Sequence, residues 1–247
     1  MINFLGGYKY MQRYKTRYEL KTEVKSLLQG NWTRAIQLYL IPVIVMIINI
    51  NVSRSNSTDA MKDAVYNNGG AFSSLLSTSL TSYIISLVVL LISLSSAFRG
   101  LDWIEDPQLD FQPIKSNFTY FRSPDWWKLI LIYILVGIFT FLWTLLLVIP
   151  GIIKMMAYSQ TYFIYKDLND RGEADGLSLT DYITRSRRLM VGNKGRYFML
   201  QLSFLGWWIL GSITLGIGFI WIYPYYKLTM ANFYQDLVDK NAANDIR

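Results

Sequence analysis

The chain has 247 residues, of which 52% are hydrophobic, and its 24 basic and 17 acidic residues give a net charge of +7. It contains no cysteine and no histidine, which excludes disulfides, thiol nucleophiles, the usual zinc ligands and an imidazole base. Every acidic residue falls outside the apolar segments, which argues against carboxylate-pair or metal catalysis within a membrane. We therefore expect a protein that is not an enzyme and needs no cofactor.

The N-terminal part of the chain combines a basic arm with an amphipathic helix. We expect residues 1–15 to be disordered. Thr16 and Glu19 then form a capping box, the signature of a helix start, and Leu20, Val24 and Leu28 follow at helical spacing. The pattern predicts a surface helix over residues 16–30 that lies flat on the inner membrane face.

Six apolar runs follow, and most are long enough to cross about 30 Å of hydrocarbon at about 1.5 Å per residue. A soluble domain of this size does not contain six such runs. The sequence therefore predicts an all-α polytopic membrane protein with a single six-span domain over residues 16–237 and a C-terminal tail over 238–247. The predicted spans cover residues 33–50, 75–98, 128–149, 152–165, 197–215 and 217–234.

The connections between the runs predict three helical hairpins. The first loop, residues 51–70, is polar, and the acidic residues after the second run, Asp102 among them, are expected to form a solvated loop. Pro150 and Gly151 separate the third and fourth runs, since proline stops a helix and glycine lets the chain reverse. Gly216 and Gly218 are expected to do the same between the last two runs.

A second surface helix is predicted over residues 178–191. Residues 16–40 align without a gap with residues 178–202, and Ser178 with Asp181 repeats the capping box. We interpret the two segments as an internal repeat; chance similarity between amphipathic stretches is the alternative. The identical pairs are Thr22/Thr184, Leu27/Leu189, Gly30/Gly192, Asn31/Asn193, Arg34/Arg196, Leu38/Leu200 and Leu40/Leu202.

The basic residues indicate the orientation in the membrane. If both termini are cytosolic, only Arg54, Lys62 and Lys154 fall outside, with Lys227 left within the last span. This bias over short loops is typical of an N-in, C-in protein of the cytoplasmic membrane. The positive charge flanks apolar runs and forms no separate domain, so we expect anionic lipid headgroups and no nucleic acid as partner. A membrane-protein partner or a second copy of the chain stays open.

Two groups of residues are candidate contacts. Basic residues in and after the second surface helix are expected to bind anionic lipid at the surface, namely Arg185, Arg187, Arg188, Lys194 and Arg196. Lys227 lies near the middle of the last predicted span, where a lysine costs about 2.5–3.5 kcal/mol on insertion. We expect it to contact an anion or lipid together with Tyr226 and Asn232. The alternative is that Lys227 extends to an interface.

Several motifs together resemble one known family: 27–32 (LLQGNW), 149–153 (IPGII), 186–190 (SRRLM) and 202–208 (LSFLGWW). It is the integral membrane family of Gram-positive bacteria catalogued as domain of unknown function number nine hundred and seventy-five, and the resemblance covers residues 14–237. Gly195 departs from the bulky residue expected there. The Ile-Pro-Gly hairpin is also similar, more distantly, to the membrane domain of some glycerophosphodiester phosphodiesterases. The resemblance implies a membrane fold and transfers no site.

These observations favour a non-enzymatic membrane protein that interacts with lipid or with a membrane-inserted partner. Modulation of the envelope, or its protection against membrane-active peptides, is the role we expect. The alternative is a transporter of small molecules or lipids, or a subunit of one, that uses the hairpin interfaces and Lys227.

Overall fold

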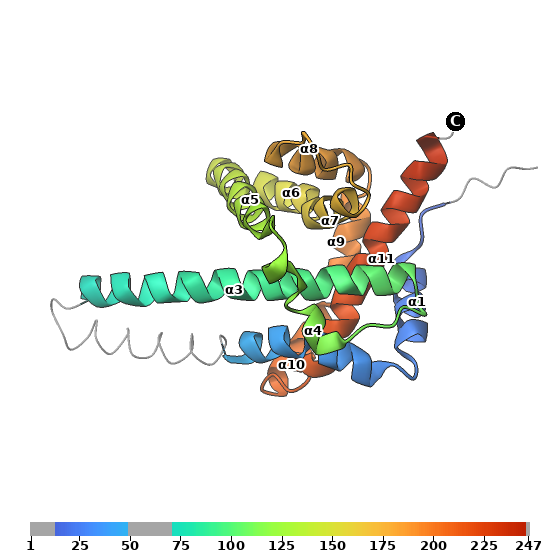
Figure 1. Cartoon of the computed structure of the whole chain (residues 1–247), viewed down its shortest axis with the longest axis horizontal. Coiled ribbons are helices and arrows are strands. Elements are labelled where there is room, and N and C mark those ends of the chain that lie inside the picture. Colours follow the sequence, from blue (N-terminus) through green and yellow to red (C-terminus); the bar gives the residue numbers. More distant parts are fainter. Residues whose placement is uncertain (1–12, 49–70, 246–247) are drawn as a thin grey trace, which may run out of the picture.

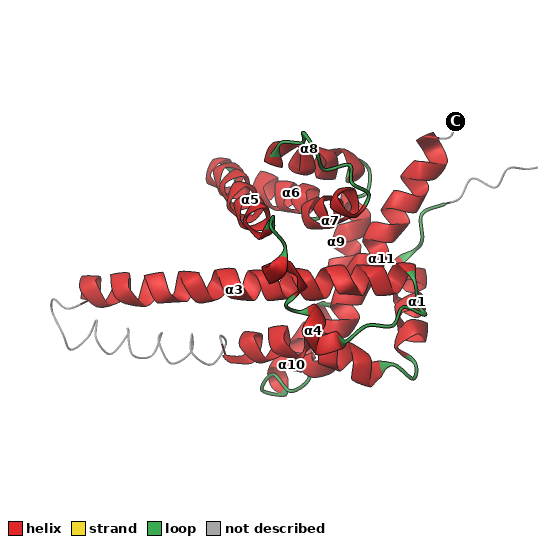
Figure 2. Ribbon diagram, viewed as in Figure 1, coloured by secondary structure: helices red, strands yellow, loops and turns green. Residues whose placement is uncertain are grey.

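The computed structural model describes residues 13–48 and 71–245, and every element in these two ranges is helical (Figure 1, Figure 2). The all-α class is therefore confirmed. The first twelve residues of the predicted N-terminal arm, the predicted loop 51–70 and the last two residues of the tail lie outside the described ranges.

By length and composition, two described helices can cross a membrane, Ile85–Glu105 and Trp126–Leu146. A third span results if the bent pair Arg17–Leu28 and Trp32–Ile48 counts as one. The predicted spans 152–165 and 197–215 each fall on two shorter helices. These are α6 (Val148–Tyr158) with α7 (Thr161–Asp170), and α9 (Lys194–Leu202) with α10 (Leu205–Ile213).

The first amphipathic helix begins with the capping box predicted from the sequence, but its apolar residues Leu20, Val24 and Leu28 are buried in the protein core instead of facing a membrane. In α1 (Arg17–Leu28) the Thr16 N–H donates to Glu19 Oε2 at 2.6 Å, and the Glu19 N–H donates to Thr16 Oγ1 at 3.3 Å. Gly30 then adopts a φ of 81°, a left-handed conformation that glycine takes without strain. The next helix, Trp32–Ile48, runs at 105° to α1.

The second surface helix, α8 (Leu179–Leu189), has the same local design. The Asp181 carboxylate accepts hydrogen bonds from the Ser178 N–H at 2.8 Å and the Ser178 hydroxyl at 2.7 Å, and Gly192 has a φ of 76°. A shift of 162 residues carries the first residue of α1 onto that of α8, and Trp32 onto the first residue of α9. The two segments thus share one helix–turn–helix geometry. Their origin as a repeat stays an interpretation.

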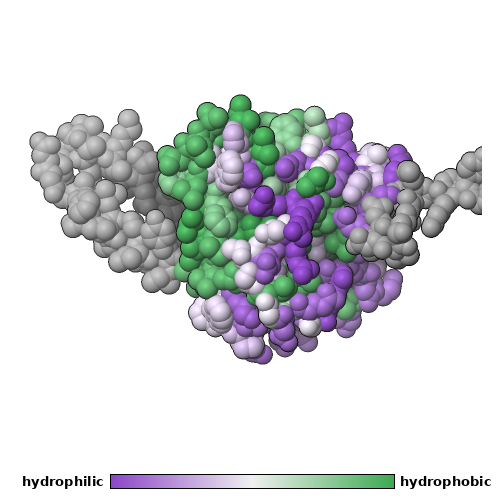
Figure 3. Space-filling view, turned by 90° about the horizontal axis from the view of Figure 1, so that it is seen from above, coloured by the Kyte–Doolittle hydropathy of each residue, from purple (hydrophilic) through white to green (hydrophobic). Residues whose placement is uncertain are grey.

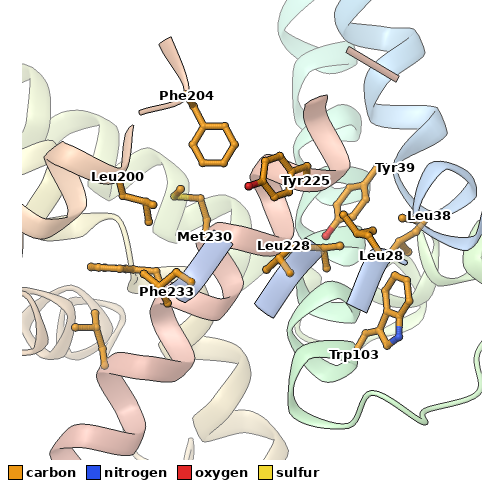
Figure 4. Close-up of a cluster of buried hydrophobic side chains, with 14 of the residues drawn as sticks. Leu28, Leu38, Tyr39, Trp103, Leu200, Phe204, Tyr225, Leu228, Met230 and Phe233 are labelled. Atoms are coloured by element: carbon orange, nitrogen blue, oxygen red, sulfur yellow. The ribbon is translucent and has the colours of Figure 1, made fainter. Parts of the chain in front are cut away.

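The long helix α11 (Phe219–Asp245) packs against α1, α3 (Ala71–Glu105), α8 and α10, and it crosses α3 in Figure 1. The main core lies between them. Figure 4 shows Tyr39 and Trp103 on one side of this core, Leu228 in its middle, and Phe204 and Phe233 towards the other side. These side chains come from four segments of the chain, with Leu228 and Phe233 both on α11, and each is fully buried.

A second core joins α3 to α5 (Trp126–Leu146), α7, α8 and α11, while α6 packs against α5 and contributes Ala157 and Tyr158 to a smaller cluster. The predicted turn at Pro150 and Gly151 is wrong by a few residues, because the chain leaves helical geometry at Leu147 instead. Pro150 lies in the first turn of α6, where no N–H has an intrahelical acceptor, so a proline fits there. A Cβ at Gly151 would overlap Thr144, which shows how closely α5 and α6 approach each other.

Two short elements, α4 (Pro113–Ser116) and the 3₁₀ helix η1 (Thr119–Arg122), connect α3 to α5. The acidic loop predicted here is wrong at Asp102, because α3 continues to Glu105 and carries this residue into the protein. Asp102 forms ion pairs with Arg99 at 3.1 Å and with the buried Lys166.

Candidate functional site

A large apolar surface is exposed on one side of the molecule. On the face seen in Figure 3, hydrophobic residues gather towards the left and hydrophilic residues towards the right. At the α5–α6 turn Leu145 is 73% exposed, and after α10 Leu215 is 77% exposed. Exposed apolar surface on this scale marks a contact with a membrane or another protein. It agrees with the two to three helices that can cross a membrane.

Basic residues of α8 form the charged part of the surface. Arg185, Arg187 and Arg188 are exposed, and none of them forms an ion pair with a residue in 13–48 or 71–245. Hydrogen bonds from the Ser178 hydroxyl and backbone N–H lower the pKa of Asp181, so this carboxylate stays charged at the opposite end of α8. Arg185 lies one turn from Asp181 and contributes to this lowering, so Arg187 and Arg188 are the two whose charges stay free for an external anion.

Arg196 differs from the other predicted lipid contacts. Its Nη2 donates to Asp236 Oδ2 and to the Lys15 carbonyl, both at 2.6 Å, and Nη1 donates to Asn193 Oδ1 at 3.0 Å. The Asp236 side chain is only 6% exposed and also accepts the Lys15 N–H at 3.0 Å. Arg196 thus ties the N-terminal segment to α9 and α11. Lys194, at the start of α9, is half-buried and forms no ion pair within the described ranges.

Lys227 lies in a polar cluster between α9 and α11. It is half-buried, its Nζ lies 5.3 Å from the centroid of the Tyr223 ring, and no carboxylate of the described residues pairs with it. The Gln201 amide donates to the Tyr197 hydroxyl at 2.8 Å and also contacts Tyr226. Tyr197 in turn lies within electrostatic range of Lys227. We call Tyr197, Gln201, Tyr226 and Lys227 the Lys227 cluster.

Asn232 does not belong to the Lys227 cluster, although the sequence grouped them. It is 3% exposed, and its amide donates to the Leu20 carbonyl at 3.1 Å and to Glu23 Oε2 at 2.8 Å. Five residues separate Lys227 from Asn232, which places them about 140° apart around a helix at about 100° per residue. Asn232 therefore holds α1 against α11, while Lys227 faces α9.

The structure contains two helix breaks that the sequence did not predict, and each is stabilised by a surface helix. Between α6 and α7, Ser186 of α8 donates its hydroxyl to the Ala157 carbonyl at 2.8 Å and accepts the Gln160 N–H at 3.2 Å. Between α9 and α10, the Lys21 ammonium of α1 donates to the Ser203 carbonyl at 3.0 Å. Backbone groups freed by a break must find such partners when they are buried.

Two grooves flank α1 on different sides. One, of about 560 Å³, lies between α1, the end of α3 and α11, and Glu23, Glu105 and Asp239 make its lining acidic. The other, of about 440 Å³, lies between the start of α1 and α9, and its lining carries only basic charges. A smaller cavity of about 260 Å³ beside Lys166 is charge-balanced, with Arg99 and Lys166 opposite Asp102 and Asp170.

Residues 144–241 match the family described as "Protein of unknown function (DUF975)", which confirms the family resemblance over α6 to α11 and the end of α5. No curated protein and no solved structure matches the chain. The matched range contains α8, Arg196, the Lys227 cluster and both breaks. It does not contain α1.

Proposed function

We propose that this protein is a non-enzymatic, integral protein of the cytoplasmic membrane that interacts with anionic lipid or with a membrane-inserted partner. The observation that carries the proposal is the exposed apolar surface of α5, α6 and α10 together with the unpaired arginines of α8. Exposing an apolar surface to water costs free energy, so this surface is expected to contact hydrocarbon. Free guanidinium groups beside it can bind anionic headgroups.

The proposed arrangement has six spans in three hairpins, with both termini inside. The membrane-crossing segments of α3 and α5 are two of these spans, and we assign two more to the helix Trp32–Ile48 and to α11 and two broken ones to the pairs α6–α7 and α9–α10. Broken spans are tolerated where neighbouring side chains satisfy the freed backbone groups. Ser186 and Lys21 supply such partners, which supports counting each pair as one span.

The role we propose is modulation of the envelope or its protection against membrane-active peptides. A transporter or transport subunit is the second candidate, and the two breaks and the Lys227 cluster favour it, because discontinuous spans often line transport sites. A strain without the protein separates the roles. Greater sensitivity to membrane-active peptides, restored by the intact gene, supports protection; normal sensitivity with impaired solute uptake favours transport.

Cysteine labelling tests the arrangement in the membrane. The chain has no native cysteine, so single cysteines at Ser57, Ser116 and Ser178 report their own positions. Ser57 lies outside the described residues. We expect an impermeant thiol reagent to label position 57 in intact cells and position 178 only after permeabilisation, whereas the buried position 116 should stay unlabelled in the folded protein. Labelling of position 178 in intact cells contradicts the proposed arrangement, and recovery of the protein in the soluble fraction contradicts the proposed function itself.

Lipid binding tests the surface charge. We expect the full-length protein in neutral detergent to bind anionic vesicles better than neutral ones, and more weakly as salt rises. Replacing Arg187 and Arg188 together by Gln should reduce this preference, since each basic residue near the surface contributes about 1 kcal/mol. Equal binding to both kinds of vesicle would leave the electrostatic part of the proposal without support.

A further inference from the structure

The basic groove between α1 and α9 combines two kinds of wall. One wall comes from the N-terminal segment and the first turn of α1, and the other from α9, with Phe233 of α11 contributing to the lining. The groove has a volume of about 440 Å³, and Lys15 and Arg17 line it on one side and Gly195, Arg196 and Met199 on the other. This volume is within the range of about 300–1,000 Å³ that is typical of pockets for small ligands.

The interior of the groove is apolar and continues onto the apolar surface of the protein. Leu20, Leu200 and Phe233 are almost fully buried beneath it. Met199 lines the groove and is 48% exposed, and its neighbour Phe198 on α9 is 46% exposed. A chain of methylene groups lying in the groove therefore stays in apolar contact where it leaves the groove along α9.

The charge of the groove is of one sign. Lys15, Arg17 and Arg196 line it, and no acidic residue does. Lys15 pairs with Glu23 at 2.8 Å and Arg196 with Asp236 at 2.6 Å. Arg17 is exposed and forms no ion pair with any residue that the structure describes, so its charge is uncompensated.

We propose that this groove binds one anionic phospholipid, with the phosphate at Arg17 and an acyl chain over Met199, Leu200 and Phe233. The proposal rests on the proposed function, because α9 must face the bilayer for a lipid to enter. It differs from the general attraction of α8 for anionic surfaces, since it concerns one molecule held at one place. A zwitterionic lipid fits less well because its ammonium group would meet the same unpaired cation.

Gly195 provides a way to close the groove without disturbing the fold. A Cβ built at this position meets nothing within 4 Å, and Gly195 lies in α9. A larger side chain therefore enters open space in the groove, and it replaces a residue that disfavours helix. We expect Gly195→Leu to keep or raise the melting temperature while it fills the binding site.

The matched control is Gly206→Leu in α10. A Cβ at Gly206 also meets nothing within 4 Å, and this residue does not line the groove. Both variants add the same apolar side chain to an exposed helical glycine, so only the groove distinguishes them. Arg17→Glu is a second, independent variant, because an exposed side chain without an ion pair can be changed without loss of folding.

The experiment titrates the full-length protein in neutral detergent with dioleoyl phosphatidylglycerol or dioleoyl phosphatidylcholine and counts bound lipids by native mass spectrometry. We expect one phosphatidylglycerol site that is at least about fivefold tighter than phosphatidylcholine binding. Arg17→Glu should weaken phosphatidylglycerol binding about 25-fold, because it changes the charge near the phosphate by two units. Gly195→Leu should abolish it, and Gly206→Leu should leave it unchanged.

Three results would overturn the inference: equal affinity for both lipids, an unchanged site in folded Gly195→Leu or Arg17→Glu protein, or equal losses in Gly195→Leu and Gly206→Leu. All three leave the proposed function standing if the protein is recovered in the membrane fraction. Failure of the proposed function shows separately, as loss of membrane association in the intact chain.

Discussion

Replacing Arg196 by Gln is expected to destabilise the protein more than any change at the exposed arginines of α8. The change removes the cation that faces Asp236 at 2.6 Å, while the Asp236 side chain is only 6% exposed. Breaking a buried ion pair costs about 3–5 kcal/mol, because one charge stays buried without its partner. The Lys15 N–H still bonds to Asp236, and Arg196 is itself 25% exposed, so we take the lower end, about 3 kcal/mol.

The assay is thermal unfolding of the purified protein in mild detergent. For a chain of this length about 1 kcal/mol shifts the melting temperature by about 2–4 °C, so Arg196→Gln should lower it by about 6–12 °C. Arg187→Gln is the matched control. It removes an exposed arginine without an ion pair, and it should change stability by no more than about 0.5 kcal/mol.

A double-mutant cycle assigns the loss to the pair. Asp236→Asn alone should also destabilise, and the double variant should lose clearly less than the sum of the two single losses, by about 1–3 kcal/mol. If the Arg196→Gln and Arg187→Gln variants have the same melting temperature, Arg196 does not hold α9 to α11. The same conclusion follows if the stability losses of Arg196→Gln and Asp236→Asn are additive. Its role as a surface lipid contact, expected from the sequence, would then gain weight.

Three further predictions use the same melting assay. Ser186→Ala leaves the Ala157 carbonyl and the Gln160 N–H at the α6–α7 break without their hydroxyl partner, and each unsatisfied group should lower the free energy of unfolding by about 1–3 kcal/mol. The control Ser26→Ala, on the exposed side of α1, should lower it little, and equal effects of the two changes would refute the role of Ser186. Tyr39→Phe removes a buried hydroxyl that has no partner among the described residues, so the protein should melt at the same or a higher temperature, and a clear loss would show an unseen partner. Lys227→Met should keep or raise the melting temperature because it removes an unpaired half-buried charge. If the Lys227 cluster binds an anionic lipid, less of this lipid should co-purify with the variant than with the unchanged protein; an unchanged amount of lipid indicates that Lys227 extends to an interface.

Local features were predictable from the sequence because their causes lie within a few residues. The starts of α1 and α8 depend on a hydroxyl and a carboxylate three residues apart, and their ends depend on a glycine that tolerates positive φ. The all-helical class follows in the same way from long apolar runs. The position of the α5–α6 turn was missed by a few residues, since proline is as compatible with a first helical turn as with a stop.

The candidate site was predictable only in part. Tyr226 and Lys227 do lie together, because adjacent residues of one helix stay adjacent, but Asn232 points to α1 since helical geometry turns it to another face. The partners of Lys227 on α9, Tyr197 and Gln201, carry no signal in the sequence that ties them to α11. Hydroxyl and amide side chains are common in helices, and only packing selects which of them meet.

The sequence by itself determined that the protein is helical, where its two surface helices begin, and that its charges and apolar residues are segregated. These properties follow from composition, capping and periodicity. The tertiary structure alone decided that Arg196 pairs with Asp236, that Ser186 and Lys21 satisfy the two breaks, and that a basic groove opens beside Gly195. The hydrogen bonds of Arg196, Ser186 and Lys21 join residues 26 to 182 positions apart, where chain distance says nothing about proximity and packing decides the partner.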